Sequence, residues 1–507
     1  MRSTIKMTLY FWSNLIVTFL LISTLEVSSQ QDGQMENKKV VCYYTNWSSY
    51  RPGELAFFPK DINPSLCTHL IYAFLTFKED LGGLAAFDSF QDIDRKGFQQ
   101  FADLKSMNKD LKLLAAIGGW REGSKRFSAI ARSEESRRTF AKGVIQFLRQ
   151  YNFEGINIDW QYPAFREGSI DKDRNNFVEL LKTLKDEFDA ENTTLDKLLL
   201  TTSAPQNTEY IEKGFDLPEI QKYVEFITIV CYDYHLSTDL VVNHHSPLYA
   251  LPQEVGDEAK LNVDWTVRFI IEHGVAREKI VLGIPAYGRT FTLMDENMHQ
   301  IGSPSDGEGP EGVSTREIGY KAFYEICQDI IKEGWQVVHV NRTALGPYAH
   351  KGKNWVSFDD EDSARRKGEY AREQNLGGIM FWSIDDDDYT GRCGDRKYPL
   401  IQSAKEGFYS FSASMTTEDT TTTSSTPMPT RATRPVQMTT DQTVTPRLRS
   451  VSADTLSAGE DGIIENRPFL NSPPSGSHTV SREFKDHGNT FYQSISIWIT
   501  NNVFHLG

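Results

Sequence analysis

Short apolar runs rich in β-branched residues alternate with amphipathic stretches from residue 39 to about residue 408. Runs of this length and composition predict buried strands. The predicted strands are 40–44, 69–75, 112–117, 155–159, 198–203, 226–232, 279–285 and 377–382. Between them, 134–151 and 175–188 carry apolar residues at the spacing of a helix face. Ser133, which two acidic residues follow, is the expected N-cap of the first of these helices.

This alternation predicts the α/β class, and within it a (β/α)8 TIM barrel rather than an open doubly wound sheet. No G-x-G-x-x-G motif follows the first strand, which removes the main argument for a dinucleotide site. We expect no cofactor and no metal ion. Residues 286–376, between the last two predicted strands, are far more than one helix needs, so they predict an inserted subdomain at about 289–355.

The two ends of the chain differ from the barrel region. Within 1–29, basic residues, an apolar run at 9–22 and small residues follow one another in the order of a cleaved secretory signal peptide. The alternative, an uncleaved membrane anchor, is disfavoured because the run is short and Asn14 interrupts it. The barrel domain then spans 30–412. Thr, Ser and Pro dominate the chain after it, so 413–507 is predicted to be a disordered tail.

Charge and hydropathy narrow the possible partners. The formal net charge of −15 argues against nucleic acid, which would call for a basic face. No segment after the leader is long and apolar enough for a membrane span, and Asn501 and Asn502 disfavour a glycolipid-anchor signal at the C-terminus. We therefore expect a secreted, extracellular monomer.

Five cysteines in an oxidising compartment predict two disulfides and one free thiol. Cys42 and Cys67 lie near two early strands and form one expected pair, and Cys327 with Cys393 is the other. Cys231 lies in an apolar strand and is expected to be a buried thiol. Five free core cysteines are the alternative, because sequence alone does not fix connectivity. Sequons for N-glycosylation occur at Asn46, Asn192 and Asn341.

The strand at 155–159 carries the candidate chemistry. Asn157, Asp159 and Gln161 are spaced two apart, so their side chains share one face of the extended chain. Three carboxylates at that spacing could provide general acid and base catalysis. Because only one of the three residues is a carboxylate here, the pattern predicts a site that binds its ligand without cleaving it.

Other strand ends supply aromatic and polar residues to the same end of the barrel, where TIM barrels place their sites. The predicted site residues are Tyr43, Tyr44, Phe74, Trp120, Asp159, Gln161, Tyr162, Tyr232, Asp233, Tyr287, Arg289, Met380 and Trp382. Aromatic rings pack on the C–H faces of sugars, and a few polar groups bind the sugar hydroxyls and acetamides. For any single ring, a role as a core cap is equally expected. Their recurrence at several strand ends favours a sugar site.

Several motifs together carry a family resemblance. They are VCYYTNWSSYRPGE, LCTHLIYAF, LLAAIGGWREGSKRFS, FEGINIDWQYP, GIPAYGRTFTL and GGIMFWSIDDDDYTGRCG. On these motifs the chain resembles glycoside hydrolase family 18, the chitinases and chitinase-like lectins, from residue 39 to about 410. The resemblance implies a barrel with an α+β insertion between strand 7 and helix 7. It also implies chitin or chito-oligosaccharides as the partner.

The catalytic signature of this family, Asp-x-x-Asp-x-Asp-x-Glu, falls on Glu154, Asn157, Asp159 and Gln161. In active members the final Glu protonates the glycosidic oxygen, and the neighbouring Asp holds the substrate acetamide that attacks the anomeric carbon. The resemblance thus implies that Asp159 holds the acetamide. It gives the same role to Tyr232 and Asp233, places Trp382 under the central sugar, and lets Tyr162, Tyr287 and Arg289 line the cleft.

The departures from the family pattern decide the expected activity. Gln161 has no proton to give, and Asn157 lacks the inner carboxylate. Val230 stands where Met is usual, and Arg121 stands where Asn is common. YHLSTD follows Asp233 in place of HGxW, so an aromatic residue of the reducing side is missing, and we expect the non-reducing side to be better preserved.

The leading hypothesis is a secreted chitinase-like lectin that binds chitin or N-acetylglucosamine oligosaccharides without hydrolysis. One alternative is a weak chitinase that uses Asp159 and the substrate acetamide alone. Another is a scaffold or signalling glycoprotein that acts through a protein partner, which nothing in the sequence names. Glu167 and Asp171 follow the motif and are expected to be solvated loop charges rather than substitute acids.

Overall fold

The computed structural model describes residues 38–410, 478–486 and 489–497. The chain divides into two compact units, Met1–Glu418 and Asp419–Gly507. The predicted signal peptide and most of the predicted tail lie outside the described residues, so both stay predictions.

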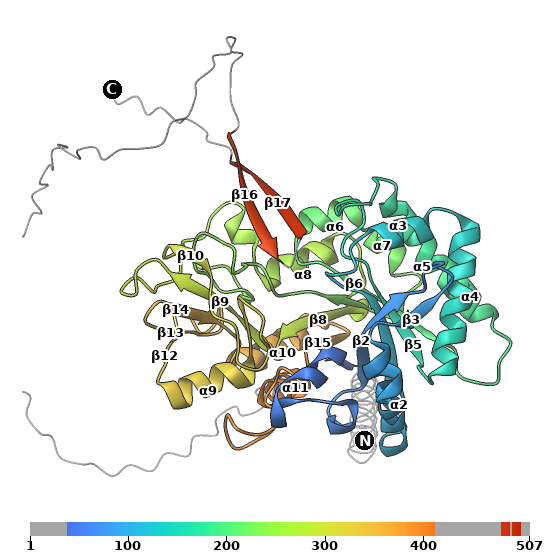
Figure 1. The fold of residues 1–507 in the computed structure, drawn as a ribbon, viewed down its shortest axis with the longest axis horizontal. Helices are drawn as coiled ribbons and strands as arrows, with labels where there is room; N and C mark the ends of the chain where they lie inside the picture. The colour runs from blue at the N-terminus through green and yellow to red at the C-terminus, as the bar shows by residue number, and fades with distance from the viewer. Residues whose placement is uncertain (1–37, 411–477, 487–488, 498–507) are drawn as a thin grey trace, which may run out of the picture. The chain divides into compact units, whose positions relative to one another are not determined.

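Eight parallel strands close into a barrel in the first unit, which confirms the predicted (β/α)8 fold (Figure 1). The strands are β1 (Lys39–Thr45), β2 (His69–Phe77), β4 (Lys112–Gly118), β5 (Gly155–Asp159), β6 (Leu199–Ala204), β7 (Ile227–Ile229), β8 (Ile280–Pro285) and β15 (Gly378–Trp382). Each pairs with the next, and β15 pairs with β1 to close the ring. A short strand, β3 (Leu84–Ala86), pairs antiparallel with β2. Strand β7 is shorter than the predicted 226–232, because pairing stops where the chain turns into the barrel mouth.

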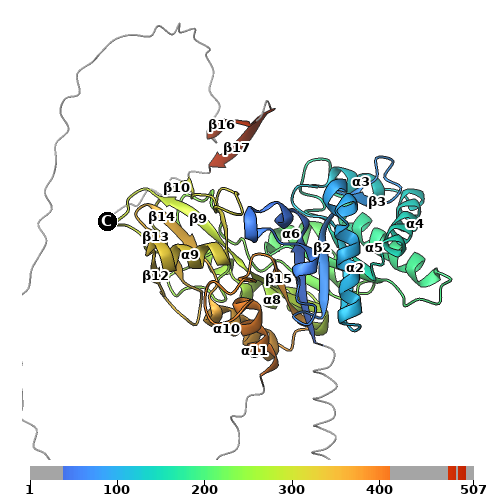
Figure 2. The same ribbon diagram turned by 60° about the horizontal axis from the view of Figure 1, so that its bottom comes forward.

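Helices surround the barrel (Figure 2). They are α2 (Gly97–Met107), α3 (Lys125–Ala131), α4 (Glu134–Gln150), α5 (Asp173–Ala190), α6 (Thr208–Gly214), α7 (Leu217–Ile220), α8 (Val263–Glu272), α9 (Phe323–Glu333), α10 (Glu361–Glu373) and α11 (Pro399–Tyr409). Short helical turns are η1 (Asn46–Tyr50), η2 (Gly53–Leu55), η3 (Pro59–Asp61), η4 (Phe90–Asp94), η5 (Glu258–Lys260) and η6 (Arg277–Lys279). Ser133 caps α4 as predicted, since its hydroxyl accepts a hydrogen bond from Ser136 N at 3.1 Å. Among the described helices, none combines the length and the hydropathy that crossing a membrane would require.

A second sheet with α9 forms the inserted subdomain between β8 and β15 (Figure 1). Its strands are β9 (Tyr287–Leu293), β10 (Ser305–Glu308), β11 (Tyr320–Ala322), β12 (Gln336–Val338), β13 (Tyr348–Lys351) and β14 (Asn354–Ser357). The order is β10-β9-β14-β13-β12, and β11 pairs with the other part of β9. Because β9 begins just after β8 ends, the first residues of the insertion lie at the barrel mouth.

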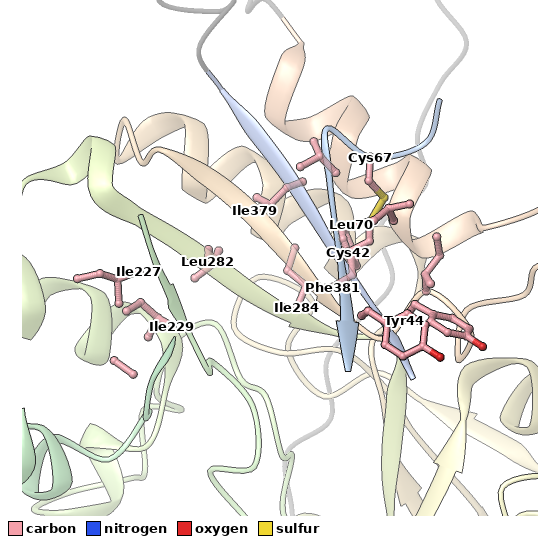
Figure 3. Packing of buried hydrophobic residues seen from close by; sticks show 14 of the residues in the cluster. Cys42, Tyr44, Cys67, Leu70, Ile227, Ile229, Leu282, Ile284, Ile379 and Phe381 are labelled. Atoms are coloured by element: carbon pink, nitrogen blue, oxygen red, sulfur yellow. A yellow bond between two sulfur atoms is a disulfide. The ribbon is translucent and has the colours of Figure 1, made fainter. Parts of the chain in front are cut away.

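The barrel wall separates two layers of core. Along β1, Val41 and Tyr43 pack in the barrel interior, whereas Cys42 and Tyr44 pack outwards. Figure 3 shows the outer layer, in which strand residues such as Leu70 and Phe381 accompany them. This alternation follows from the two-residue period of a strand. It decides which strand-end side chains reach the mouth of the barrel.

Two disulfides support the barrel. Cys42–Cys67 joins β1 to the segment before β2 (Figure 3), and Cys327–Cys393 joins α9 to the segment after β15. Cys231 is buried and free, so the predicted pairing and the predicted free thiol are confirmed. Burial raises the pKa of the Cys231 thiol to about 12, so this residue behaves as a small apolar side chain.

The second unit contains an antiparallel hairpin of β16 (His478–Asp486) and β17 (Asn489–Ile497). This part of 413–507 is therefore not the unstructured tail that the composition predicts. The reason is local, since 489–497 regains the β-branched and aromatic residues that favour strands.

Candidate functional site

Strand β5 brings the three polar residues of the FEGINIDWQYP motif together at the barrel mouth. Asn157 is fully buried, Asp159 is 5% exposed and Gln161 is half-buried just beyond the strand end. The Gln161 amide Nε2 donates to both carboxylate oxygens of Asp159, at 3.2 Å to Oδ1 and 3.0 Å to Oδ2. The group that faces Asp159 is thus a neutral donor.

Asn157 takes part in a neutral hydrogen-bonded network inside the barrel. Its Nδ2 donates to Thr201 Oγ1 at 3.1 Å, and its Oδ1 accepts from Ser203 Oγ at 3.1 Å. Ser203 Oγ in turn accepts from Thr228 Oγ1 at 3.0 Å and lies 3.3 Å from Tyr43 OH. Both polar atoms of the Asn157 side chain are therefore satisfied by uncharged partners.

These neutral surroundings set the protonation of Asp159. Burial raises the pKa of Asp159 from 3.8 to about 6, and the hydrogen bonds from Gln161 oppose that shift in part. The carboxylate is ionised at neutral pH and takes up a proton near pH 6. In its ionised form it can accept a hydrogen bond from an N–H group of a ligand.

Asp233 is a second carboxylate at the mouth, and charged as well as neutral donors hold it. Tyr287 OH donates to its Oδ1 at 2.7 Å. Arg289 donates from Nε to Oδ1 at 2.7 Å and from Nη2 to Oδ2 at 2.6 Å. Burial alone would raise the pKa of Asp233, but the Arg289 guanidinium outweighs burial and holds it well below the usual range. Asp233 therefore has no proton to donate.

Aromatic rings form the floor of the site where β1, β2 and β15 end. The Trp382 ring lies 5.3 Å from Tyr43 and 5.8 Å from Phe74, measured between centroids. Trp47 lies 6.3 Å from both Phe74 and Trp382, and it is 45% exposed. Sequence reasoning missed Trp47, although its position two residues past β1 was a usable signal. The floor has the geometry of a platform for a sugar ring.

Further aromatic residues line the wall between the barrel and the insertion. Tyr232 and Met380 are buried in the inner core layer, and Val230 packs against the same layer. Tyr287 stacks on Tyr320 with ring centroids 4.4 Å apart. Tyr320 was missed because it belongs to β11 of the insertion, which no strand-end rule places at the mouth.

The loops after β4 and β5 carry two more of the predicted residues. Trp120 follows β4 and is 64% exposed. The Tyr162 ring lies 5.2 Å from Tyr210 of α6. Burial, followed by the charges of Asp159 and Asp233, raises the pKa of Tyr162, so its hydroxyl lies within the field of both carboxylates.

Two residues of the predicted motif set lie elsewhere. Tyr44 is fully buried in the outer core, where its ring packs on Tyr72 at 5.2 Å, so its placement in the site was wrong. The reason is strand alternation, since its neighbour Tyr43 takes the inner face. Glu154 precedes β5 at the opposite end of the barrel, where its carboxylate pairs with Lys105 at 2.8 Å and Lys112 at 3.3 Å.

The structure separates the predicted sequons. Asn46 is 2% exposed, and its Nδ2 donates to Asp92 Oδ1 at 3.0 Å. A glycan on that nitrogen is incompatible with this fold, so the prediction at Asn46 was wrong. Asn192 is exposed and Asn341 is half-buried, and glycosylation at these two stays a prediction.

The chemistry available at the mouth is limited. Glu167 and Asp171 are exposed on the loop after β5, as expected of solvated charges. Within the described ranges, no cluster of three or more His, Cys, Asp or Glu side chains could hold a metal ion. The arrangement can hold a polar ligand between an ionised carboxylate, an amide and an aromatic floor. It does not place a carboxylic acid where Gln161 stands.

Comparison with known proteins places this geometry in a family. The model of "Glycosyl hydrolases family 18" matches residues 39–387. The mouse protein Chitotriosidase-1 is 36% identical over 371 residues, which cover 73% of this chain and 77% of that protein. Probable chitinase 10 of Drosophila melanogaster is 35% identical over 368 residues, or 72% of this chain, and the match spans only 16% of that longer protein.

A solved structure resembles the barrel closely. Human YKL-39, described as a pseudo-chitinase with retained chitooligosaccharide binding properties, has a TM-score of 0.68 and 36% identity. The match covers 74% of this chain and all of the other.

Proposed function

The chain belongs to family 18 of the glycosyl hydrolases, and we propose that it is a secreted chitinase-like lectin that binds chitin or N-acetylglucosamine oligosaccharides without hydrolysing them. The observation that carries the proposal is the hydrogen bond from the Gln161 amide to the buried Asp159 carboxylate. A glutamic acid is expected at position 161 of an active member.

Loss of hydrolysis follows from proton transfer. Cleavage of a glycosidic bond requires a proton on the leaving oxygen, and an amide has none to give near neutral pH. A positioned general acid contributes about 10²–10⁴ in rate, or about 3–5 kcal/mol of barrier. Asp233 does not replace the missing acid because Arg289 keeps it ionised.

Retained binding follows from shape and hydrogen bonding. Gln161 and Asn157 are nearly isosteric with Glu and Asp, so the substitutions preserve the volume of the site. Asp159 can accept a hydrogen bond from a ligand acetamide N–H. The ring of Trp382, backed by Tyr43 and Phe74, offers an apolar face to a sugar ring.

Secretion is supported by the disulfides. Disulfides form and persist in oxidising compartments, and this chain carries Cys42–Cys67 and Cys327–Cys393. The order of basic, apolar and small residues within 1–29 supports the same conclusion.

Calorimetric titration of the intact chain with chitohexaose tests the proposal. We expect saturable binding that weakens about tenfold in Trp382→Ala, because the variant removes the stacking face. Tyr249→Ala is the matched control, since Tyr249 is 38% exposed and packs against Tyr370 of α10 rather than at the mouth. Absence of binding up to millimolar chitohexaose would refute the lectin proposal.

A fluorogenic chitotrioside assay tests the absence of hydrolysis separately. We expect no turnover above background. Turnover that disappears in Asp159→Ala would instead support the alternative of a weak chitinase.

A further inference from the structure

A buried carboxylate, Asp386, lies between the floor and the wall of the site. The floor includes Trp382 at the end of β15, whereas Tyr287 and Tyr320 of the wall belong to β9 and β11 of the insertion. Asp386 follows β15 and is 2% exposed. Floor and wall thus come from different parts of the chain, and a ligand that contacts both needs them at a fixed separation.

Donors from three segments occupy both oxygens of the Asp386 carboxylate. Its Oδ2 accepts from Tyr320 OH at 2.6 Å and from Ser383 Oγ at 2.8 Å. Its Oδ1 accepts from Arg51 Nη2 at 2.7 Å. Ser383 directly follows Trp382 in the sequence. One side chain therefore joins the end of β15, the segment after β1 and the insertion.

Arg51 connects Asp386 to the end of β1. The guanidinium also donates to Asp385, from Nη2 to Oδ2 at 2.8 Å and from Nη1 to the backbone carbonyl oxygen. The carboxylate of Asp385 accepts from the backbone N of Thr45 at 2.9 Å and from the Thr45 hydroxyl at 2.7 Å. The side chains of Arg51, Asp385 and Asp386 are buried. A buried network with all its members bonded is rigid, so Asp386 has a firm support on the barrel side.

From Tyr320 the connection continues into the wall. The Tyr320 ring stacks on Tyr287 with centroids 4.4 Å apart and 16° between the planes. The Arg289 guanidinium lies 5.2 Å from the centroid of Tyr287 and 5.5 Å from that of Tyr320. Tyr287 OH donates to Asp233 Oδ1 at 2.7 Å. A shift of Tyr320 would therefore also shift Tyr287 and the partners of Asp233.

The backbone makes its own contact between floor and insertion, but only where the insertion begins. Ala286 N donates to the Trp382 carbonyl oxygen at 2.8 Å. Strand β11 follows much later in the chain, and its Tyr320 hydroxyl is bonded to the barrel side through Asp386. The placement of the stacked Tyr287 and Tyr320 rings thus depends on this side-chain contact.

We infer that Asp386 is a positioning residue, which holds the wall of Tyr287 and Tyr320 at a fixed separation from Trp382 so that one sugar chain can contact both. The inference rests on the proposed function, because it assigns that separation to sugar binding. As a buried residue, Asp386 acts through its neighbours rather than by touching the ligand. A site whose two sides are fixed in advance loses less conformational freedom when a ligand binds.

Amide hydrogen exchange of the ligand-free chain tests whether Asp386 holds the wall. Tyr320→Phe removes the bond to Asp386 but keeps the ring that stacks on Tyr287. We expect exchange in β11 and at the start of β9 to become at least about threefold faster. Tyr370→Phe is the matched control, since Tyr370 OH donates to Asp264 Oδ1 at 3.0 Å between the outer helices α10 and α8. Unchanged exchange in Tyr320→Phe would overturn the inference, whether or not the chain binds sugar.

Calorimetric titration with chitohexaose tests the consequence for binding. We expect Tyr320→Phe and Asp386→Leu each to weaken the affinity about fivefold, and Tyr370→Phe to leave it within twofold. Asp386→Asn should also stay within twofold, because an amide can accept from Arg51 and donate to both hydroxyls. Tyr320→Phe is the milder change, so it decides the question if Asp386→Leu does not fold.

A double variant separates positioning from a purely structural role. In a Trp382→Ala background, Tyr320→Phe should cause little further loss of affinity, because the floor that the wall must match is gone. A fivefold loss that persists in that background would mean that Asp386 supports only the fold, and it would overturn the inference. Absence of chitohexaose binding by the unmodified chain would refute the proposed function, while hydrogen exchange still decides whether Asp386 holds the wall.

Discussion

Asp159 and Asp233 both lie at the mouth of the barrel, yet their surroundings differ. Asp159 receives its hydrogen bonds from the neutral amide of Gln161, and burial dominates its pKa. Asp233 receives two hydrogen bonds from the Arg289 guanidinium and one from Tyr287. Two carboxylates at the same end of the barrel, one at the end of β5 and one after β7, thus have pKa values shifted in opposite directions.

This difference shows that the hydrogen-bonding and charged partners of each carboxylate, rather than its burial, determine whether it can take up a proton near neutral pH. Burial opposes ionisation at both positions. At Asp233 the Arg289 guanidinium outweighs the effect of burial, so this residue stays negatively charged and holds Tyr287 and Arg289 in place by hydrogen bonds. At Asp159 no such cation is among the causes of the shift, so this residue can exchange a proton near pH 6. Of the motif positions 154, 157, 159 and 161, Asp159 is the one titratable group at the mouth, because Glu154 lies at the opposite end of the barrel.

The largest effect is expected from giving Asp159 an acidic partner. In Gln161→Glu/Asn157→Asp, the new carboxyl at position 161 would lie where the amide now lies, about 3 Å from Asp159. Two carboxyl groups at that distance share a proton, which raises the pKa of one and makes it a general acid. We expect chitotrioside hydrolysis to rise about 10²–10⁴-fold over the unmodified chain.

The single variants serve as controls for this change. Gln161→Glu alone should recover part of the activity, and Asn157→Asp alone should recover none, because it supplies no proton donor to the leaving group. If the double variant folds and binds chitohexaose yet stays inactive, the departures at Val230 and after Asp233 must also contribute to the loss of hydrolysis.

A second test removes the cation from Asp233 and so makes it resemble Asp159. The side chains of Arg289 and Asp233 are 18% and 23% exposed, so Arg289→Met leaves a largely buried carboxylate without its charged partner. We expect a loss of about 2–3 kcal/mol of unfolding free energy at pH 7 by urea denaturation. The loss should shrink at lower pH, because the freed Asp233 can then take up a proton.

Arg138→Met is the control for this variant. Arg138 is 51% exposed and pairs with Glu134 of α4 and Glu187 of α5, so we expect a change within about 1 kcal/mol. Equal losses in Arg289→Met and Arg138→Met would contradict the contrast between the two carboxylates.

The fold was largely predictable because its signals are local and periodic. Apolar runs such as 112–117 became strands, and Ser133 capped the helix that its acidic neighbours indicated. The hairpin of β16 and β17 was missed because the composition of the whole tail masked a short strand-forming segment. Likewise β7 ended early, because sequence pattern does not show where pairing stops.

A site residue was predictable where its position at the end of a barrel strand alone brings it to the mouth. Site residues that other contacts bring to the mouth were not predictable. Asp159 and Trp382 follow directly from strand ends. The placement of Tyr44 in the site was wrong. Tyr43 and Tyr44 are adjacent and point to opposite faces of β1, and the sequence does not show which of them faces the barrel interior until the strands that pair with β1 are known. Tyr320 reaches the site through its contact with Tyr287, a residue of a distant segment, which no single segment of sequence displays.

The smallest expected effect is a pH dependence that Asp159 should show and Asp233 should not. If the ionised Asp159 accepts the acetamide N–H, chitohexaose affinity should fall as pH drops through about 6, by about tenfold between pH 7 and pH 5. The free energy of unfolding of the ligand-free protein should instead rise as the pH drops through this range. Because the folded pKa lies above the unfolded value of 3.8, the contribution of Asp159 to stability is full below that value and is lost as pH rises through about 6.

Titration calorimetry and urea unfolding at several pH values measure both trends. In Asp159→Asn the affinity should be weaker and flat between pH 5 and pH 7, because Asp233 stays ionised throughout that window. A flat affinity profile in the unmodified chain would mean that the acetamide does not bind the ionised Asp159. If affinity and stability change in opposite directions with pH, and neither change occurs in Asp159→Asn, the titrating group is Asp159. Protonation of a group that only unfolds the site would lower affinity and stability together.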